Sequence, residues 1–200
     1  MINMDKNLII SITVIVLIIV AIISYNSITN NTINEEEMVE INSENTVVVL
    51  ETSQGDIYIE MYDNMPITTE NFVKLVSEGF YDGVIFHRVI PNFMIQGGDP
   101  DGTGTGGPGY TIEDEFVEGS SNLRGTIAMA NTGQPNSGGS QFFINLVDNT
   151  FLDYDKQPLT SKHPAFGRVI QGMDVVDKIA SIRTDSMDRP TLDVTINKAY

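Results

Sequence analysis

The chain has 200 residues, and its 41% hydrophobic content is enough for one well-buried domain with an appendage. Its formal net charge of −16 argues against a nucleic-acid partner, because phosphate backbones are bound by clustered lysine and arginine. The absence of cysteine excludes disulfides and thiol chemistry.

The N-terminal part is predicted to be a membrane anchor. Residues 1–7 form a short flank, and residues 8–25 are an uncharged apolar run that reaches the roughly 17 to 20 residues needed to span a bilayer. A cleaved signal peptide is the alternative, but no pattern of small residues typical of a cleavage site follows the run. Lys6 precedes the run and residues 35–37 are glutamates, which by the positive-inside tendency favours an extracytoplasmic domain. We therefore expect a single-pass membrane protein that contacts the lipid bilayer through residues 8–25.

Residues 26–45 are rich in Asn, Ser, Thr and Glu and poor in aromatic residues, which predicts a flexible polar tether. The folded domain is expected to occupy residues 46–200. Within it, residues 47–52 and 56–61 are typical of two strands joined by a tight turn at residues 53–55.

A helix is predicted to begin at Pro66 and end near Glu78, before Gly79. A second helix is expected over residues 174–181. The other segments predicted to be strands are residues 83–90, 93–96, 111–116, 125–131, 140–146, 165–170 and 192–199. Many short strands with only two helices favour a closed antiparallel barrel capped by helices.

One stretch, FHRVIPNFMIQGGD at residues 86–99, combines a cation with apolar residues. The turn at Pro91 and Asn92 is predicted to fold it into a hairpin that brings Arg88 close to Phe93, Met94 and Gln96. A guanidinium beside an apolar wall either binds a ligand or is held in a structural ion pair.

The only two histidines, His87 and His163, lie far apart in the sequence and have no convincing carboxylate or cysteine partners, so we predict no metal site. For His87, on a strand beside Arg88, a structural, hydrogen-bonded histidine is the favoured interpretation.

Further motifs follow in the order GTGTGG (residues 102–107), MAN (129–131), GSQFFI (139–144) and HPAFG (163–167). Strand alternation predicts that Gln141 and Phe143 face one side and Phe142 the other. With these motifs in this order, residues 46–200 closely resemble the cyclophilins, the barrel-shaped peptidyl-prolyl cis-trans isomerases.

The resemblance implies a mainly β fold, a closed eight-stranded antiparallel barrel with two α-helices, here preceded by one transmembrane helix. It implies that Arg88 is the catalytic arginine, and that Phe93, Met94, Phe143 and Leu152 form a pocket for the proline ring with His163 at its edge. Gln96, Ala130, Asn131 and Gln141 match the groove that holds the substrate backbone. Phe151 stands where many members carry tryptophan, so only weak cyclosporin binding is expected. The segment of residues 154–162 is longer than the corresponding segment of the shorter family members, and it is expected to form an exposed loop.

The resemblance therefore implies an enzyme that accelerates rotation about X–Pro bonds and assists protein folding at a membrane surface. We expect it to act on proline-containing polypeptides as a monomer, without cofactor or metal. An alternative is a binding module or chaperone that holds proline segments with little turnover. Peptide exchange rates compared with aggregation-suppression assays would separate the two.

Overall fold

The computed structural model describes residues 46–157 and 162–200. The predicted flank, span and tether in residues 1–45 lie outside the described residues, as do residues 158–161 of the predicted exposed loop. Within the described ranges, no helix combines the length and the apolar character needed to cross a membrane.

The domain opens with the predicted hairpin. β1 (Val47–Thr52) pairs antiparallel with β2 (Gly55–Met61), and the ladder closes with Thr52 opposite Gly55. Alternate side chains of both strands enter the barrel core, as the period of two in a strand requires. The hairpin prediction is therefore confirmed.

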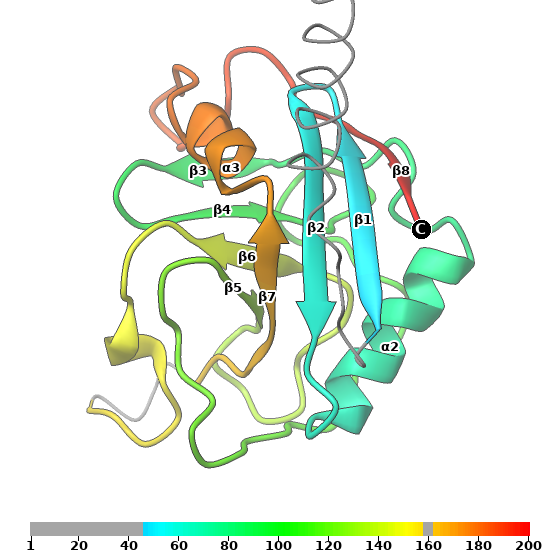
Figure 1. Ribbon diagram of the computed structural model, residues 1–200, viewed down its shortest axis with the longest axis vertical. Helices are drawn as coiled ribbons and strands as arrows, with labels where there is room; N and C mark the ends of the chain where they lie inside the picture. Colours follow the sequence, from blue (N-terminus) through cyan, green and yellow to red (C-terminus); the bar gives the residue numbers. More distant parts are fainter. Residues whose placement is uncertain (1–45, 158–161) are drawn as a thin grey trace, which may run out of the picture. The chain divides into compact units, whose positions relative to one another are not determined.

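Eight antiparallel strands form one sheet in the order β3-β4-β6-β5-β7-β2-β1-β8 (Figure 1). Non-sequential neighbours such as β4 and β6 bring segments that are far apart in the chain side by side. The remaining strands are β3 (Arg88–Ile90), β4 (Met94–Gly97), β5 (Thr126–Met129), β6 (Phe142–Asn145), β7 (Ala165–Gln171) and β8 (Ile196–Ala199).

The predicted closure of the barrel is wrong as a continuous ladder. The two ends of the sheet, β3 and β8, are not paired with each other, so the barrel is open. Only one isolated bridge, Ile85 with Thr195, spans this seam among the described residues, supported by hydrogen bonds such as Phe86 N–H to the Val194 carbonyl at 2.9 Å. The segment before β3 therefore crosses the seam as irregular chain instead of as the long strand 83–90 that was predicted.

Two α-helices complete the domain, as predicted, and lie well apart from each other (Figure 1). α2 (Pro66–Ser77) begins at a proline, whose missing N–H costs nothing in the first turn, and ends before Gly79, which adopts a φ of 69°. α3 (Met173–Ala180) follows Gly172 directly, at a φ of 91°.

Residues 111–116 do not form the predicted strand. Ile112 makes one isolated bridge to Gly138, and the Glu115 carboxylate instead accepts hydrogen bonds from the N–H groups of Ile67 and Thr68 at 3.2 and 2.9 Å. These are orphan donors of the first turn of α2, where a negative charge is also favoured by the helix dipole. Satisfying the helix terminus thus takes the place of a β ladder in this segment.

A group of aromatic rings lies within the largely aliphatic core of the barrel. Phe72 of α2 contacts Tyr81, Phe142 and Phe166 with ring centroids 5.1 to 5.4 Å apart. The Tyr81 hydroxyl donates to the backbone carbonyl of Ser140 at 3.0 Å. The core therefore holds in place the chain that leads into β6, which carries part of the candidate site.

Candidate active site

Three neighbouring strands place a cation, an amide and an aromatic ring in one row. Arg88 of β3 pairs with Gln96 of β4, and Gln96 pairs with Phe143 of β6. Directly paired residues project to the same face of a sheet. The next residue along β4, Ile95, belongs to the barrel core, so the row lies on the outer face. The hairpin predicted from residues 86–99 is present and sets this arrangement.

A small apolar cluster lies beside this row, separate from the barrel core. Met94 and Phe143 enter it from the sheet, and Leu152 enters it from the short 3-10 helix η1 (Thr150–Leu152). Phe142, the neighbour of Phe143, belongs to the core instead, as the alternation predicted. The buried members are Met94, Ala128, Phe143, Leu152 and Ala165, and the partly buried ones are Ile90, Phe93 and Ala130.

Two aromatic contacts form the rim of the cluster. Phe151 is 51% exposed and stacks on Phe93 with ring centroids 6.0 Å apart. His163 meets the Phe143 ring edge-to-face at 5.4 Å, and its Nδ1 lies 3.0 Å from the Met129 carbonyl. The structure therefore brings Phe151 and His163 to the edge of the same cluster that contains the four predicted pocket residues.

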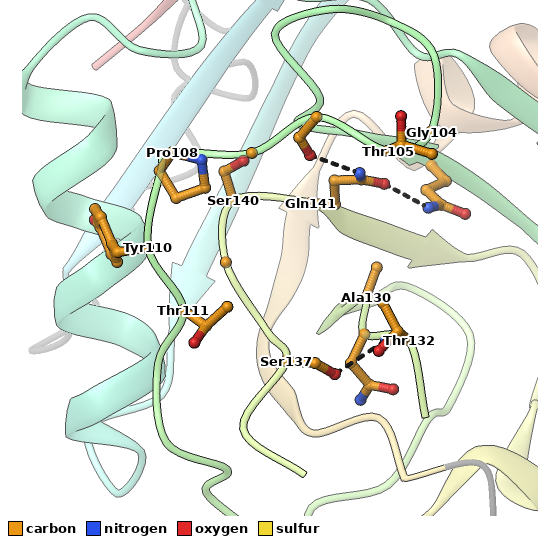
Figure 2. Close-up of a pocket in the computed structure, with 15 residues that line it drawn as sticks. Gly104, Thr105, Pro108, Tyr110, Thr111, Ala130, Thr132, Ser137, Ser140 and Gln141 are labelled. Carbon is orange, nitrogen blue, oxygen red and sulfur yellow. Dashed lines mark hydrogen bonds between the residues drawn. The ribbon is translucent and has the colours of Figure 1, made fainter. Parts of the chain in front are cut away.

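A polar cavity of about 350 Å³ lies next to the row and is lined by the four predicted groove residues together with the glycine-rich loop. Figure 2 shows the Gln141 side chain between two partners: its Oε1 accepts from Gln96 Nε2 at 3.0 Å, and its Nε2 donates to the Gly106 carbonyl at 2.9 Å. None of the residues lining this cavity is charged. The cavity therefore presents hydrogen-bonding groups without an ion, which suits a neutral peptide backbone.

Asn131 lines the cavity, but its side chain is already engaged. Its Nδ2 donates to the Lys162 carbonyl at 2.6 Å, and its Oδ1 accepts from the Gly133 N–H at 3.0 Å. The backbone N–H and carbonyl of Asn131 have no hydrogen-bond partner among the described residues. The main chain of Asn131, and not its amide, is therefore the part available to a peptide.

A buried polar network supports the apolar cluster from behind, and the sequence reasoning missed it. The Phe93 carbonyl accepts from Asn149 Nδ2 at 2.8 Å, and Asn149 Nδ2 also donates to Asn145 Oδ1 at 2.8 Å. Asn122 Nδ2 donates to the His163 carbonyl at 2.9 Å and to the buried Asp153 carboxylate at 3.0 Å. An asparagine at the end of the apolar strand FFIN was the available signal, because a buried amide needs partners.

The glycine-rich loop is organised by one carboxylate. Asp99 is buried, and its oxygens accept backbone N–H bonds from Asp101, Thr103, Gly104 and Gly106. Burial opposes ionisation of Asp99, but these four donors outweigh it and hold its pKa below the ordinary value. The loop that lines the cavity is therefore held by an ionised aspartate acting as an acceptor.

His87 departs from its prediction. It is buried as expected, with 7% exposure, but neither ring nitrogen has a hydrogen-bond partner among the described residues. Burial lowers its pKa below the usual value, the nearby Asp99 carboxylate opposes that shift, and Arg189 and Arg88 add to it. The prediction of a buried histidine is confirmed, but the prediction that it is hydrogen-bonded is wrong, because no donor or acceptor among the described residues reaches either ring nitrogen.

Both imidazoles are expected to titrate below the ordinary pKa of about 6.5. Burial lowers the pKa of His163 as well, and its bond to the Met129 carbonyl only partly offsets this. Below about pH 6.5 the unfolded chain therefore binds more protons on these rings than the folded chain does. The free energy of unfolding should be highest above about pH 6.5 and fall as the pH decreases through that value. Urea unfolding at pH 7.5 and 5.5, with NMR titration of both rings, checks this. A titration midpoint at or above 6.5 for either ring would contradict it.

Comparison with known proteins bears on what this site does. Residues 47–200 match the family described as cyclophilin type peptidyl-prolyl cis-trans isomerase/CLD. A peptidyl-prolyl cis-trans isomerase of Schizosaccharomyces pombe is 49% identical over 160 residues, covering 76% of this chain and 96% of that protein. The human peptidyl-prolyl cis-trans isomerase-like 1 is 46% identical over 161 residues, covering 76% and 90%. A crystal structure of a cyclophilin-type isomerase of Cryptosporidium parvum, obtained in the presence of the dipeptide Ala-Pro, superposes with a TM-score of 0.70 at 31% identity, covering 77% and 97%.

These findings correct one expectation from the sequence. The predicted localisation was a single-pass membrane protein with an extracytoplasmic domain. Two findings contradict it. The relatives that match are named as isomerases or isomerase-like proteins, and no helix of residues 46–157 and 162–200 can cross a bilayer. The segment on which the prediction depended, residues 8–25, lies outside the described residues.

Proposed function

The chain belongs to the cyclophilin-type peptidyl-prolyl cis-trans isomerases, and from that membership we propose which of its residues accelerate rotation about X–Pro bonds. One observation carries the proposal. The Arg88–Gln96–Phe143 row lies on three hydrogen-bonded strands. Beside it lies an apolar cluster that is separate from the barrel core. An always-charged donor next to a hydrophobic pocket and a neutral polar cavity suits a proline ring and its flanking backbone.

The chemistry requires no nucleophile. Amide resonance resists twisting with a barrier of about 18–20 kcal/mol, and the bond passes through a state in which the proline nitrogen has gained a lone pair. A fixed guanidinium donor stabilises that lone pair more than it stabilises the planar amide, which is preferential binding of the transition state. Because arginine does not deprotonate in proteins, Arg88 acts as a hydrogen-bond donor and not as a general acid.

Each part of the site has one role in this proposal. The cluster of Phe93, Met94, Phe143 and Leu152 grips the proline ring, with Phe151 and His163 at its edge. The cavity lined by Gln96, Ala130, Asn131 and Gln141 holds the chain on one side of the rotating X–Pro bond, so that twisting is confined to that bond. Proline-containing polypeptides are the substrates, and assistance to their folding is the expected outcome, because X–Pro isomerisation takes tens to hundreds of seconds unaided.

Exchange spectroscopy on a proline-containing peptide tests the function directly. Catalytic amounts of the full chain should bring cis and trans signals into measurable exchange without changing their equilibrium ratio. Peptide binding seen by chemical-shift changes, without exchange between the two isomers, would favour the binding-module alternative. An aggregation-suppression assay on the same preparation would then measure that alternative.

Cyclosporin binding is proposed to be weak and to depend on Phe151. Its exposed ring stacks on Phe93 but lacks the indole N–H of tryptophan. Phe151→Trp should tighten the cyclosporin Kd by roughly 2- to 10-fold, the scale of one added hydrogen bond, as measured by calorimetry. Tyr200→Trp, which adds the same indole at an exposed position outside the site, is the control. An unchanged Kd for Phe151→Trp would show that the indole donor does not limit affinity here.

A further inference from the structure

One carboxylate faces the guanidinium of Arg88. Asp188 Oδ2 lies 3.7 Å from Arg88 Nε, and both side chains are 44% exposed. No other ion pair of Arg88 is formed among residues 46–157 and 162–200. The carboxylate approaches the guanidinium at Nε, at a distance longer than a hydrogen bond, and among the described residues no hydrogen bond occupies the two terminal nitrogens.

The loop that carries Asp188 is tightly built. Its ends are joined by a bridge between Thr184 and Pro190, and the Asp185 carboxylate accepts from the N–H groups of Met187 and Arg189 at 2.8 and 3.0 Å. Asp188 itself has a φ of 64°, a left-handed conformation that costs a non-glycine residue energy.

The same loop is fastened to the site at two points. The Asp188 carbonyl accepts from the Val89 N–H on the edge of β3 at 2.8 Å, directly after Arg88. Arg189 Nη1 donates to the Gly102 carbonyl at 2.9 Å, at the start of the glycine-rich loop that lines the cavity. These bonds fix the backbone of Asp188 beside Arg88, so that its carboxylate lies within ion-pair distance of the guanidinium.

We propose that Asp188 is a positioning residue for catalysis, which orients the Arg88 guanidinium through its Nε edge so that Nη1 and Nη2 face the twisting bond. The proposal rests on the proposed role of Arg88. An exposed ion pair of this kind adds little to folding stability, because solvent screens it. Restricting an arginine, whose side chain is rich in rotamers, before the substrate arrives instead lowers the entropic cost of reaching the transition state.

Two variants remove the contact without straining the backbone. Asp188→Asn removes the charge and keeps a residue that tolerates a left-handed φ, and Asp188→Gly removes the side chain at a φ that suits glycine. Asp193→Asn makes the same charge change in the same part of the chain, at a carboxylate that pairs with Arg189 and not with Arg88. All three are made in the full chain and assayed by exchange spectroscopy at subsaturating and saturating peptide.

Asp188→Gly is expected to lower kcat by about fivefold, the upper end of what an exposed ion pair contributes, with KM changed less than about twofold. Asp188→Asn should show a smaller loss of the same kind, and Asp193→Asn should match the parent. The Arg88 Nε–Hε NMR signal should shift in both Asp188 variants, which shows that the contact exists in solution. A loss confined to kcat, with KM and the free energy of unfolding unchanged, is the result that a purely structural role would not give.

Asp188→Gly should have no further effect in an Arg88→Ala background, because there is then no guanidinium to orient. Parent kcat in both Asp188 variants would overturn the proposal and leave the isomerase function standing. Parent activity in Arg88→Ala itself would instead remove the role of Arg88 on which the proposal rests.

Discussion

Arg88→Ala is expected to lower kcat/KM by about 10²-fold or more, the scale observed when one preorganised donor is lost from an active site. Arg88 is the only cation in the row that it forms with Gln96 and Phe143, so its removal leaves the developing lone pair on the proline nitrogen without a donor. Exchange spectroscopy on a proline peptide measures the rate directly.

Peptide binding should weaken far less than the rate, because the apolar cluster of Phe93, Met94, Phe143 and Leu152 remains intact. Arg88→Lys should also lose most of the activity, since a flexible point charge does not reproduce the planar fork of donors. Arg183→Ala removes another exposed arginine, one that belongs neither to the apolar cluster nor to the lining of the cavity, and controls for net charge. A stably folded Arg88→Ala protein that isomerised the peptide at near the parent rate would refute this mechanism and favour the binding-module function.

Local sequence signals predicted the elements whose structure is set locally. The hairpin of β1 and β2 follows from alternating apolar residues around a short turn, and α2 follows from a proline at its start and a glycine after its end. The predicted helix of residues 66–78 differs from the observed Pro66–Ser77 by one residue at its C-terminus. Such signals need no knowledge of the rest of the chain.

The failures lie where distant segments compete for the same backbone groups. Residues 111–116 have the composition of a strand, yet Glu115 satisfies the N-terminus of α2, a partner almost 50 residues away. Residues 83–87 are apolar enough for a strand, but they cross the open seam of the barrel and make only one bridge. Closure of a barrel depends on how the two edge strands meet, which periodicity within each strand does not encode.

In the candidate site, too, locally determined features were predicted and long-range contacts were not. Alternation in GSQFFI correctly assigned Phe142 to the core and Phe143 to the opposite face, and the hairpin of residues 86–99 correctly brought Arg88 to Gln96. The contact of Arg88 with Asp188 joins residues 100 positions apart through a strained turn, and no pattern in the sequence indicates it. That no described residue hydrogen-bonds the His87 ring could not be predicted either, because hydrogen bonding depends on neighbours and not on residue type.

Gly98→Ala is expected to destabilise the fold by about 2–5 kcal/mol. Gly98 has a φ of 85°, which costs an alanine roughly 1–2 kcal/mol. A methyl group at Gly98 would also overlap the backbone carbonyl of Ser140 and come within 3.0 Å of Gln141 Cα, and overpacking of this kind costs typically about 1–3 kcal/mol more. Because both neighbours are backbone atoms, no side-chain rotation relieves the clash. Urea unfolding of the full chain measures the loss.

Gly119→Ala separates the two contributions, because Gly119 has the same φ of 85° but nothing within 4 Å of the added methyl group. That control should lose only the conformational part, about 1–2 kcal/mol. Gly98→Ala should also impair isomerisation in the protein that remains folded, since the displaced segment contains Gln141, whose side chain joins Gln96 to the glycine-rich loop. Equal losses of stability in the two variants would mean that the chain at Ser140 yields easily. The close packing of Gly98 against Ser140 would then not be what holds the polar side of the site in place.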